Sequence, residues 1–274
     1  GEAGHTVYAT DVSETRLEIV RERCRDLPNV SVGLVGQDGF DGAFETVLLV
    51  GVLEYAPSVD RGAVPTEAAS ALLRMARTRL GRGGRLILAI ENQLGVQYLA
   101  GAREDHTAIP YFGVEDRYAE SGVITFGRNQ LAGMLRAAGF DTQNWFYPFP
   151  DYKFPTCIFT EEGLSSDSPL DPVGLLLRGQ RLSVLRQAEQ SFSLSRAWEV
   201  LRRNGLLRDL SNSFLVEAMV GQPGVEHSGG AALGWVLPSP GLRKYRAPFD
   251  VLFANGDTVV QESYGVHAQG AETV

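Results

Sequence analysis

The feature that most constrains the fold is a repeated alternation of short apolar segments with amphipathic helical segments. Residues 7–11 form a mostly apolar run that ends on the carboxylate of Asp11, which is typical of a buried strand. Ser13 can cap a helix over residues 14–24, because its hydroxyl accepts a hydrogen bond from first-turn backbone. Further strands are predicted at residues 30–35 and 44–50. The apolar end of the later one predicts burial on both faces.

The next part of the chain continues this alternation. A helix over residues 66–80 precedes a strand over residues 85–90, and this order predicts parallel strands with right-handed crossovers. Residues 93–127 have no clean period, which is typical of a lid or binding loop. Later helices are predicted at 127–138 and 170–210, and extended segments at 140–149, 155–160 and 213–220. We expect an α/β fold with a Rossmann-like, doubly wound, mostly parallel sheet and a late antiparallel strand at 213–220 or 155–160.

The elements divide the chain into three parts. Residues 1–221 are expected to form one domain, within which residues 161–210 are a helical insertion. Residues 222–247 have the composition of a linker. Residues 248–274 are expected to hold a β-hairpin, as an appendage or the start of a further domain, outside the main sheet.

Composition excludes several classes of function. The formal charge of −8 argues against a nucleic-acid partner, because phosphate contacts need a clustered basic surface. The two cysteines, Cys24 and Cys157, lie too far apart in sequence for a zinc motif, and they indicate a reducing compartment. No apolar run reaches membrane-spanning length. We therefore expect a cytoplasmic protein without a membrane span.

The order and spacing of several short motifs carry a family resemblance. The motifs are Ala9-Thr10-Asp11-Val12-Ser13, Gln37-Asp38, Gly51-Val52-Leu53-Glu54-Tyr55 and Gly83-Gly84-Arg85-Leu86. In this order they resemble the class I S-adenosylmethionine-dependent methyltransferases. Segments 90–95, 98–101, 104–106 and 148–153 look like methyltransferases associated with bacterial surface-polysaccharide enzymes of the O-antigen type. The resemblance implies methyl transfer from S-adenosylmethionine to an oxygen atom of a small-molecule or glycan acceptor.

The resemblance also implies roles for individual residues. Asp11, with Val12 beside it, would bind the ribose hydroxyls of the cofactor, and Gln37 or Asp38 would lie beside its adenine. The methionine end of the cofactor would be lined by Gly51, Val52 and Leu53. Glu54 and Tyr55 would face the transferring methyl group. A carboxylate that merely precedes a helix cap remains the alternative for Asp11.

A histidine in the irregular segment is the candidate general base. His106 has an ordinary pKa near neutrality and is flanked by Glu104 and Asp105, so it could take the proton from an acceptor hydroxyl. The alternative is a surface histidine in an acidic loop. The residues expected to bind the acceptor are Glu91, Asn92, Glu104, Asp105 and Tyr111. No metal ion is expected.

The chain departs from the family at its beginning. The family's first strand and the glycine-rich loop that cradles the cofactor's methionine have no counterpart in the printed sequence. We therefore expect an amino-terminally truncated domain that binds the cofactor poorly by itself and is inactive alone. An adjoining domain of the same parent chain is a further expected partner.

Two other functions remain open on the sequence. A nicotinamide-dependent oxidoreductase or sugar-nucleotide enzyme of Rossmann type also places an acid after its second strand. Such an enzyme would need a Tyr-x-x-x-Lys pair, and the sequence contains none. The second alternative is a non-catalytic module that docks a neighbouring domain.

Overall fold

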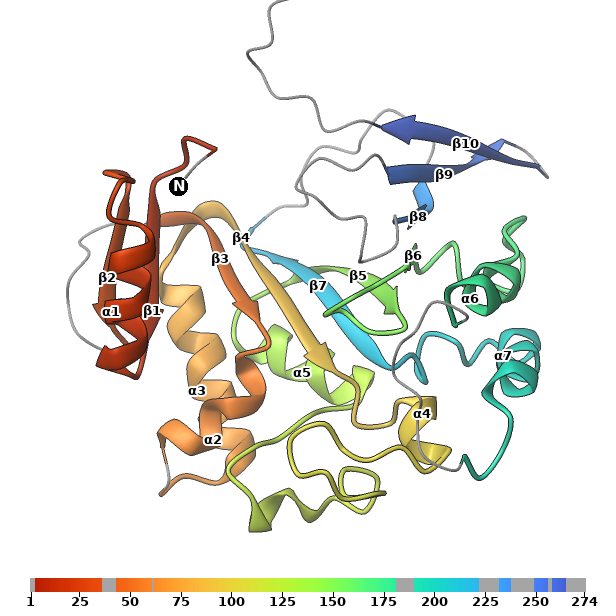
Figure 1. Ribbon diagram of the computed structural model, residues 1–274, viewed down its shortest axis with the longest axis horizontal. Helices are drawn as coiled ribbons and strands as arrows, with labels where there is room; N and C mark the ends of the chain where they lie inside the picture. The colour runs from red at the N-terminus through yellow and green to blue at the C-terminus, as the bar shows by residue number, and fades with distance from the viewer. Residues whose placement is uncertain are drawn as a thin grey trace, which may run out of the picture. The chain divides into compact units, whose positions relative to one another are not determined.

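The computed structural model describes residues 3–35, 43–60, 62–180, 190–221, 232–237, 249–255 and 258–264 (Figure 1). These residues form two compact units, Gly1–Ala43 and Phe44–Val274.

The first unit is a strand, a helix and a second strand. Strand β1 (Val7–Asp11) pairs in parallel with β2 (Val30–Leu34), and helix α1 (Glu14–Arg23) connects them. The hydroxyl of Ser13 accepts a hydrogen bond from the backbone N–H of Arg16 at 3.4 Å. The predicted cap is therefore confirmed, as is the position of Asp11 at the end of its strand.

The second unit is built on an eight-stranded sheet with the order β10-β9-β8-β6-β5-β7-β4-β3. Its strands are β3 (Phe44–Val50), β4 (Leu80–Glu91), β5 (Thr142–Phe149), β6 (Cys157–Thr160), β7 (Ser213–Met219), β8 (Ala232–Val236), β9 (Phe249–Asn255) and β10 (Thr258–Tyr264). The α/β class is confirmed. Fewer neighbouring strands of this unit are parallel than expected, because β3 and β4 form the one parallel pair among its described strands. Connections as short as 150–156 permit antiparallel pairing, whereas a parallel crossover needs a dozen residues or more.

Strand β7 lies between β4 and β5 and runs antiparallel to both (Figure 1). Its register pairs Ser213 with Glu91 and Met219 with Arg85. Residues 213–220 therefore supply the predicted late antiparallel strand. The other candidate, β6, is also antiparallel, but it pairs with β5 and β8.

Strand β3 is at one end of the strand order and has one exposed face. Leu48 and Val50 are 65% and 51% exposed, whereas Leu49 between them is 8% exposed. The expectation that this strand is buried on both faces is therefore wrong. An apolar run predicts low polarity on both faces, but it does not specify what covers each face.

Residues 249–264 form the predicted hairpin, and its strands belong to the main sheet. Strand β9 pairs with β8, which pairs with β6, so the expectation of a hairpin outside the sheet is wrong. Strand β8 lies inside the segment 222–247 that composition assigns to a linker. Glycine and proline dominate the composition of that segment, so the short alternation of Leu233 and Trp235 did not predict a strand. A further domain after residue 247 stays a prediction.

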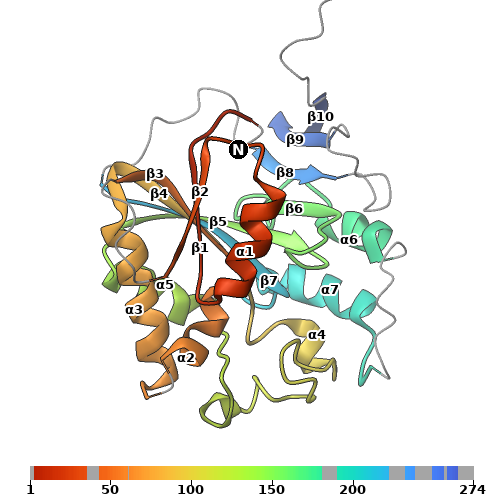
Figure 2. The same cartoon turned by 60° about the vertical axis from the view of Figure 1, so that its left-hand side comes forward.

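The helices of the second unit cover the sheet and fill the predicted insertion. The longer ones are α3 (Pro65–Thr78), α5 (Arg128–Ala137), α6 (Pro172–Gln180) and α7 (Leu194–Arg203), and the short ones are α2 (Ala56–Val59), α4 (Val96–Leu99) and the 3₁₀ helices η1 (Leu53–Tyr55) and η2 (Arg117–Glu120). Helices α6 and α7 lie side by side (Figure 2). Trp198 of α7 packs edge-on against Phe149 of β5 with ring centroids 5.3 Å apart. None of the described helices has the length and apolar character needed to cross a membrane.

Candidate active site

Two buried glutamates lie where the parallel strands β3 and β4 end. Glu91 is the last residue of β4, and Glu54 lies in η1, four residues beyond the end of β3. Both residues are 1% exposed. Because the carboxyl ends of parallel strands meet at the same edge of a sheet, two segments far apart in sequence bring these carboxylates together.

Gly51 makes the turn that directs Glu54 into this position. Its φ is +64°, and its N–H donates to the carbonyl of Ala89 at 3.0 Å. A Cβ at this position would lie 2.8 Å from the hydroxyl of Tyr152. The turn therefore requires glycine both for its backbone conformation and for its close neighbour.

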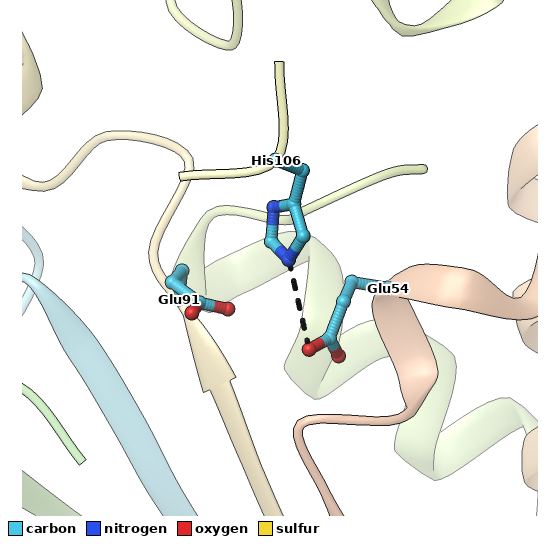
Figure 3. Close-up of side chains that lie close together, drawn as sticks. All are labelled: Glu54, Glu91 and His106. Atoms are coloured by element: carbon cyan, nitrogen blue, oxygen red, sulfur yellow. Dashed lines mark ion pairs between the residues drawn. The ribbon is translucent and has the colours of Figure 1, made fainter. Parts of the chain in front are cut away.

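His106 extends from the irregular segment toward the two glutamates. Its Nδ1 lies 2.8 Å from Oε1 of Glu104, and its Nε2 lies 3.8 Å from Oε1 of Glu54. Figure 3 shows the ring directed at the space between Glu54 and Glu91. The His106 side chain is 7% exposed, so the alternative of a surface histidine is wrong. Tyr55 packs edge-on against it with ring centroids 5.2 Å apart.

The carboxylates around His106 change its protonation. Burial alone would lower the pKa of His106, but hydrogen bonds with Glu104 and Glu54 outweigh burial and raise the pKa to about 10. Burial would raise the pKa of Glu104, but hydrogen bonds from the side chain of His106 and the backbone N–H of Thr107 hold it below its usual value. His106 is therefore protonated at neutral pH in this arrangement. Because a protonated imidazole cannot accept a proton, these contacts argue against His106 as the general base.

Lys153 is a member of the site to which the sequence assigned no role. Its ammonium forms an ion pair with Glu91 and donates to Oδ2 of Asp105 at 2.7 Å. It also lies 5.4 Å from the centroid of the Tyr152 ring. The chain has two lysines, and Lys153 follows an aromatic residue shortly after β5, within segment 148–153 of the family resemblance. The place of Lys153 within segment 148–153 was the feature of the sequence that could have indicated a role in the site.

Several carboxylate oxygens in the site lack hydrogen-bonding partners. Oε2 of Glu54 and both carboxylate oxygens of Glu91 are buried and have no hydrogen bond of acceptable geometry within the described ranges. Burial raises the pKa of Glu91, and the neighbouring Lys153 opposes that shift. Carboxylate oxygens that are buried without a hydrogen-bond donor are costly, which makes this cluster the candidate functional site.

Other residues expected to bind the acceptor have different surroundings. The Asn92 side chain is fully buried and donates to the carbonyls of Asp209 and Ser211 at 2.8 and 2.6 Å. Its Oδ1 accepts from the N–H of Leu94, so Asn92 holds the loop that follows β4. Tyr111 is 38% exposed, and its hydroxyl lies 3.0 Å from that of Ser191. These contacts give both side chains a structural role, and the binding of an acceptor by either one stays a prediction.

The structure describes some of the residues expected to bind the cofactor. In the first unit, Oδ1 of Asp11 accepts from the N–H of Ser13 at 2.8 Å, and Oδ2 lies 3.6 Å from the guanidinium of Arg16. Val12 beside it is exposed. In the second unit, Val52 is exposed, whereas Leu53 is fully buried in the core. Gln37 and Asp38 lie outside the described residues.

No family model and no curated protein matches this chain. It is similar to the solved structure of an S-adenosylmethionine-dependent methyltransferase from Thermotoga maritima, described as a possible histamine N-methyltransferase. That similarity has 14% identity and a TM-score of 0.40, over 77% of this chain and 72% of that one. The magnesium protoporphyrin IX methyltransferase of Synechocystis, solved with bound SAH, gives 16% identity and a TM-score of 0.39, over 80% of this chain and 66% of that one.

A third similar structure is phosphoethanolamine N-methyltransferase 2 of Haemonchus contortus, solved with S-adenosyl-L-methionine. It gives 12% identity and a TM-score of 0.41, over 79% of this chain and 44% of that one. This chain therefore spans less than half the length of that protein. Because all three TM-scores are below 0.5, the function proposed below rests on the residues of this chain.

Proposed function

We propose that this chain is an S-adenosylmethionine-dependent methyltransferase domain that acts on a hydroxyl of a small molecule or a glycan. The observation that carries the proposal is the meeting of residues predicted from separate segments. The sequence predicts Glu54 and Tyr55 from the end of one strand, and His106 from a later irregular segment. His106 lies 3.8 Å from the carboxylate of Glu54, and its ring centroid lies 5.2 Å from that of Tyr55. Glu54 and the His106 side chain are buried, and the exposed ring of Tyr55 packs against them.

The direction of β7 favours this function over a nicotinamide-dependent enzyme. A late antiparallel strand is expected for the methyltransferase alternative, and β7 runs antiparallel between β4 and β5. A docking module gives no reason for burying Glu54 and Glu91 beside each other at the end of the sheet. Both rivals are therefore less well supported than methyl transfer.

S-adenosylmethionine would supply a methyl group on a sulfonium sulfur, which leaves as a neutral thioether when the methyl carbon bonds to the acceptor oxygen. The chain must hold that oxygen in line, exclude water and take its proton. Glu54 and Glu91 have oxygens without hydrogen-bond donors in the part of the chain described, so either carboxylate can accept the proton. His106 would position Glu54, and Glu104 would position His106.

In the first unit, one residue has the chemistry that the cofactor needs. The Asp11 side chain is 28% exposed at a strand end, and a carboxylate there can accept hydrogen bonds from ribose hydroxyls. Roles for Gln37 and Asp38 beside the adenine, and a polysaccharide acceptor, remain predictions.

The test is calorimetric titration of S-adenosylmethionine into the natural full-length protein. Asp11→Asn should weaken binding about tenfold or more, because hydrogen bonds to charged groups contribute ~1.5–3 kcal/mol. Asp26→Asn, at an exposed acid of the same unit, is the matched control and should leave affinity unchanged. Saturable binding of a nicotinamide dinucleotide without binding of S-adenosylmethionine would contradict the proposal.

A further inference from the structure

Three side chains in the active-site cluster are arranged as ligands of a single ion. Glu54, Glu91 and His106 each offer one ligand atom, and these atoms lie within 4.8 Å of one another. Two ligands at metal distances of about 2.0–2.2 Å can be separated by up to about 4.4 Å, so small movements would bring all three atoms onto one ion. Figure 3 shows the two carboxylates and the ring converging on one space.

The second observation is an unpartnered acceptor inside this cluster. Glu54 is 1% exposed, and its Oε2 has no hydrogen-bonding partner among the residues described. Both oxygens of Glu91 are also buried without a hydrogen bond of acceptable geometry in those ranges, although Lys153 forms an ion pair with that residue. Buried charges in proteins are normally paired or coordinate a metal ion. The cluster therefore offers more acceptor oxygens than the neighbouring protein groups use.

The third observation concerns the orientation of the histidine. Oε1 of Glu104 lies 2.8 Å from Nδ1 of His106, while Oε2 of Glu104 accepts from the N–H groups of His106 and Thr107. This fixes the ring with Nε2 toward Glu54. Metal-binding histidines are usually held in this way, by a carboxylate on the ring nitrogen that does not bind the ion.

We propose that Glu54, Glu91 and His106 bind one divalent transition-metal ion. Two carboxylates balance the charge of the ion, and a set of one imidazole and two carboxylates suits Mn²⁺ and Zn²⁺. An ion binds the neutral imidazole, so it competes with a proton for Nε2 of His106. The sequence does not predict this site, because its three ligands come from separate segments with no metal-binding spacing. The inference goes beyond methyl transfer and does not need it, since ion binding is measured without cofactor or acceptor.

Lys153 gives the site a competitor for the ion. Its ammonium pairs with Glu91, but it also donates to Asp105, which can hold it when Glu91 turns to the ion. Removing the ammonium should therefore tighten ion binding. Such a gain of affinity cannot result from misfolding.

Three protein ligands leave coordination positions for water or an acceptor oxygen. An ion at such a position would draw electron density from a bound hydroxyl, and its proton would pass to the carboxylate oxygen of Glu54 or Glu91 that does not bind the ion. The ion would therefore serve the same step as the carboxylates proposed above, at the same edge of the sheet.

The experiment titrates Mn²⁺ into the chelator-treated 274-residue chain and follows free Mn²⁺ by electron paramagnetic resonance. We expect one bound ion per chain. Glu91→Gln and His106→Gln should each weaken binding about tenfold or more, the scale seen when metal-site residues are lost. Glu217→Gln and His5→Gln are matched controls outside the cluster and should bind as the parent does. Circular dichroism identifies any variant that has lost its fold.

A second variant keeps the proposal open to contradiction if those substitutions unfold the chain. Lys153→Met should bind Mn²⁺ several-fold more tightly, and Arg85→Met, which removes a cation paired with Glu217, should not. Electron spin echo spectra should show nitrogen coupling to the bound Mn²⁺. Absence of saturable binding in both the parent and Lys153→Met would overturn the proposal. Binding without nitrogen coupling, or binding unchanged in a folded His106→Gln, would also overturn it.

Discussion

Glu104 and His106 form a buried pair in which one carboxylate contacts both the ring and the backbone of the residues that follow it. Oε1 meets Nδ1 of His106 at 2.8 Å, and Oε2 accepts from the N–H groups of His106 and Thr107 at 2.8 and 2.7 Å. These three contacts make the segment a locally closed turn. The contribution of this turn to the free energy of unfolding can be measured by substitution.

Replacing the carboxylate of that turn should lower the free energy of unfolding. Glu104→Gln removes a charge-assisted contact and places an amide near backbone donors, so we expect a loss of about 1–3 kcal/mol. Urea denaturation at neutral pH measures the change. Glu115→Gln, at an exposed glutamate with a 3.9 Å ion pair to Arg117, is the control and should change stability by less than about 0.5 kcal/mol. Equal effects from the two substitutions would contradict the prediction.

The turn at Gly51 should not tolerate a methyl group. Gly51→Ala combines a φ of +64° with a contact of 2.8 Å to the Tyr152 hydroxyl. We expect a loss of about 1–3 kcal/mol, measured by thermal or urea unfolding. Gly133→Ala is the matched control, because Gly133 lies in α5 and a Cβ added there would meet nothing within 4 Å. It should stabilise the chain by about 0.5–1 kcal/mol. The prediction fails if the two alanines act alike.

The two thiols should differ sharply in reactivity. Burial raises the pKa of Cys157 to about 12, whereas Cys24 is only half-buried. Because the thiolate is the reactive species, a disulfide reagent at pH of about 8 should label Cys24 rapidly and Cys157 only on unfolding. Cys24→Ser should abolish the fast phase. Two fast equivalents in the native parent chain would show that Cys157 is accessible.

The exposed face of β3 should promote self-association. Leu48 is 65% exposed on a strand at the end of the sheet order, and edge strands with apolar surface recruit other chains. Leu48→Lys should therefore reduce light scattering at high protein concentration with little change in melting temperature. Leu49→Lys is the contrasting variant, because Leu49 is 8% exposed and a buried charge there should be strongly destabilising. Scattering unchanged by Leu48→Lys would contradict this prediction.

Local signals in the sequence predicted the parts of the fold that depend on nearby residues. Ser13 predicted the start of α1, and the acids after two apolar runs predicted where Glu54 and Glu91 would lie. The ion pair of Lys153 with Glu91 could not be predicted, because it depends on how the turn after β5 meets the end of β4. The raised pKa of His106 was predictable only in part, because Glu104 lies two residues away in the sequence whereas Glu54 acts from a distant segment.

Strand pairing was the least predictable part of the fold. Alternation of Leu233 and Trp235 is a short signal, and its strand is stabilised by partners on both sides, β6 and β9, which come from distant segments. The exposure of Leu48 likewise depends on which segments pack against β3, and the amino-acid sequence of that strand does not specify them. Period and composition report the character of a segment, whereas pairing is a property of two segments.

The insertion of β7 between β4 and β5 sets an order of events during synthesis. Strand β5 ends at Phe149 and β7 ends at Met219, so the centre of the sheet stays open while about seventy more residues are made. At about 5–20 residues per second this interval lasts several seconds, a time in which the facing edges of β4 and β5 have no partner. A ribosome-bound chain that stops short of β7 should therefore be a good substrate for chaperones, and release of β7 should end that dependence.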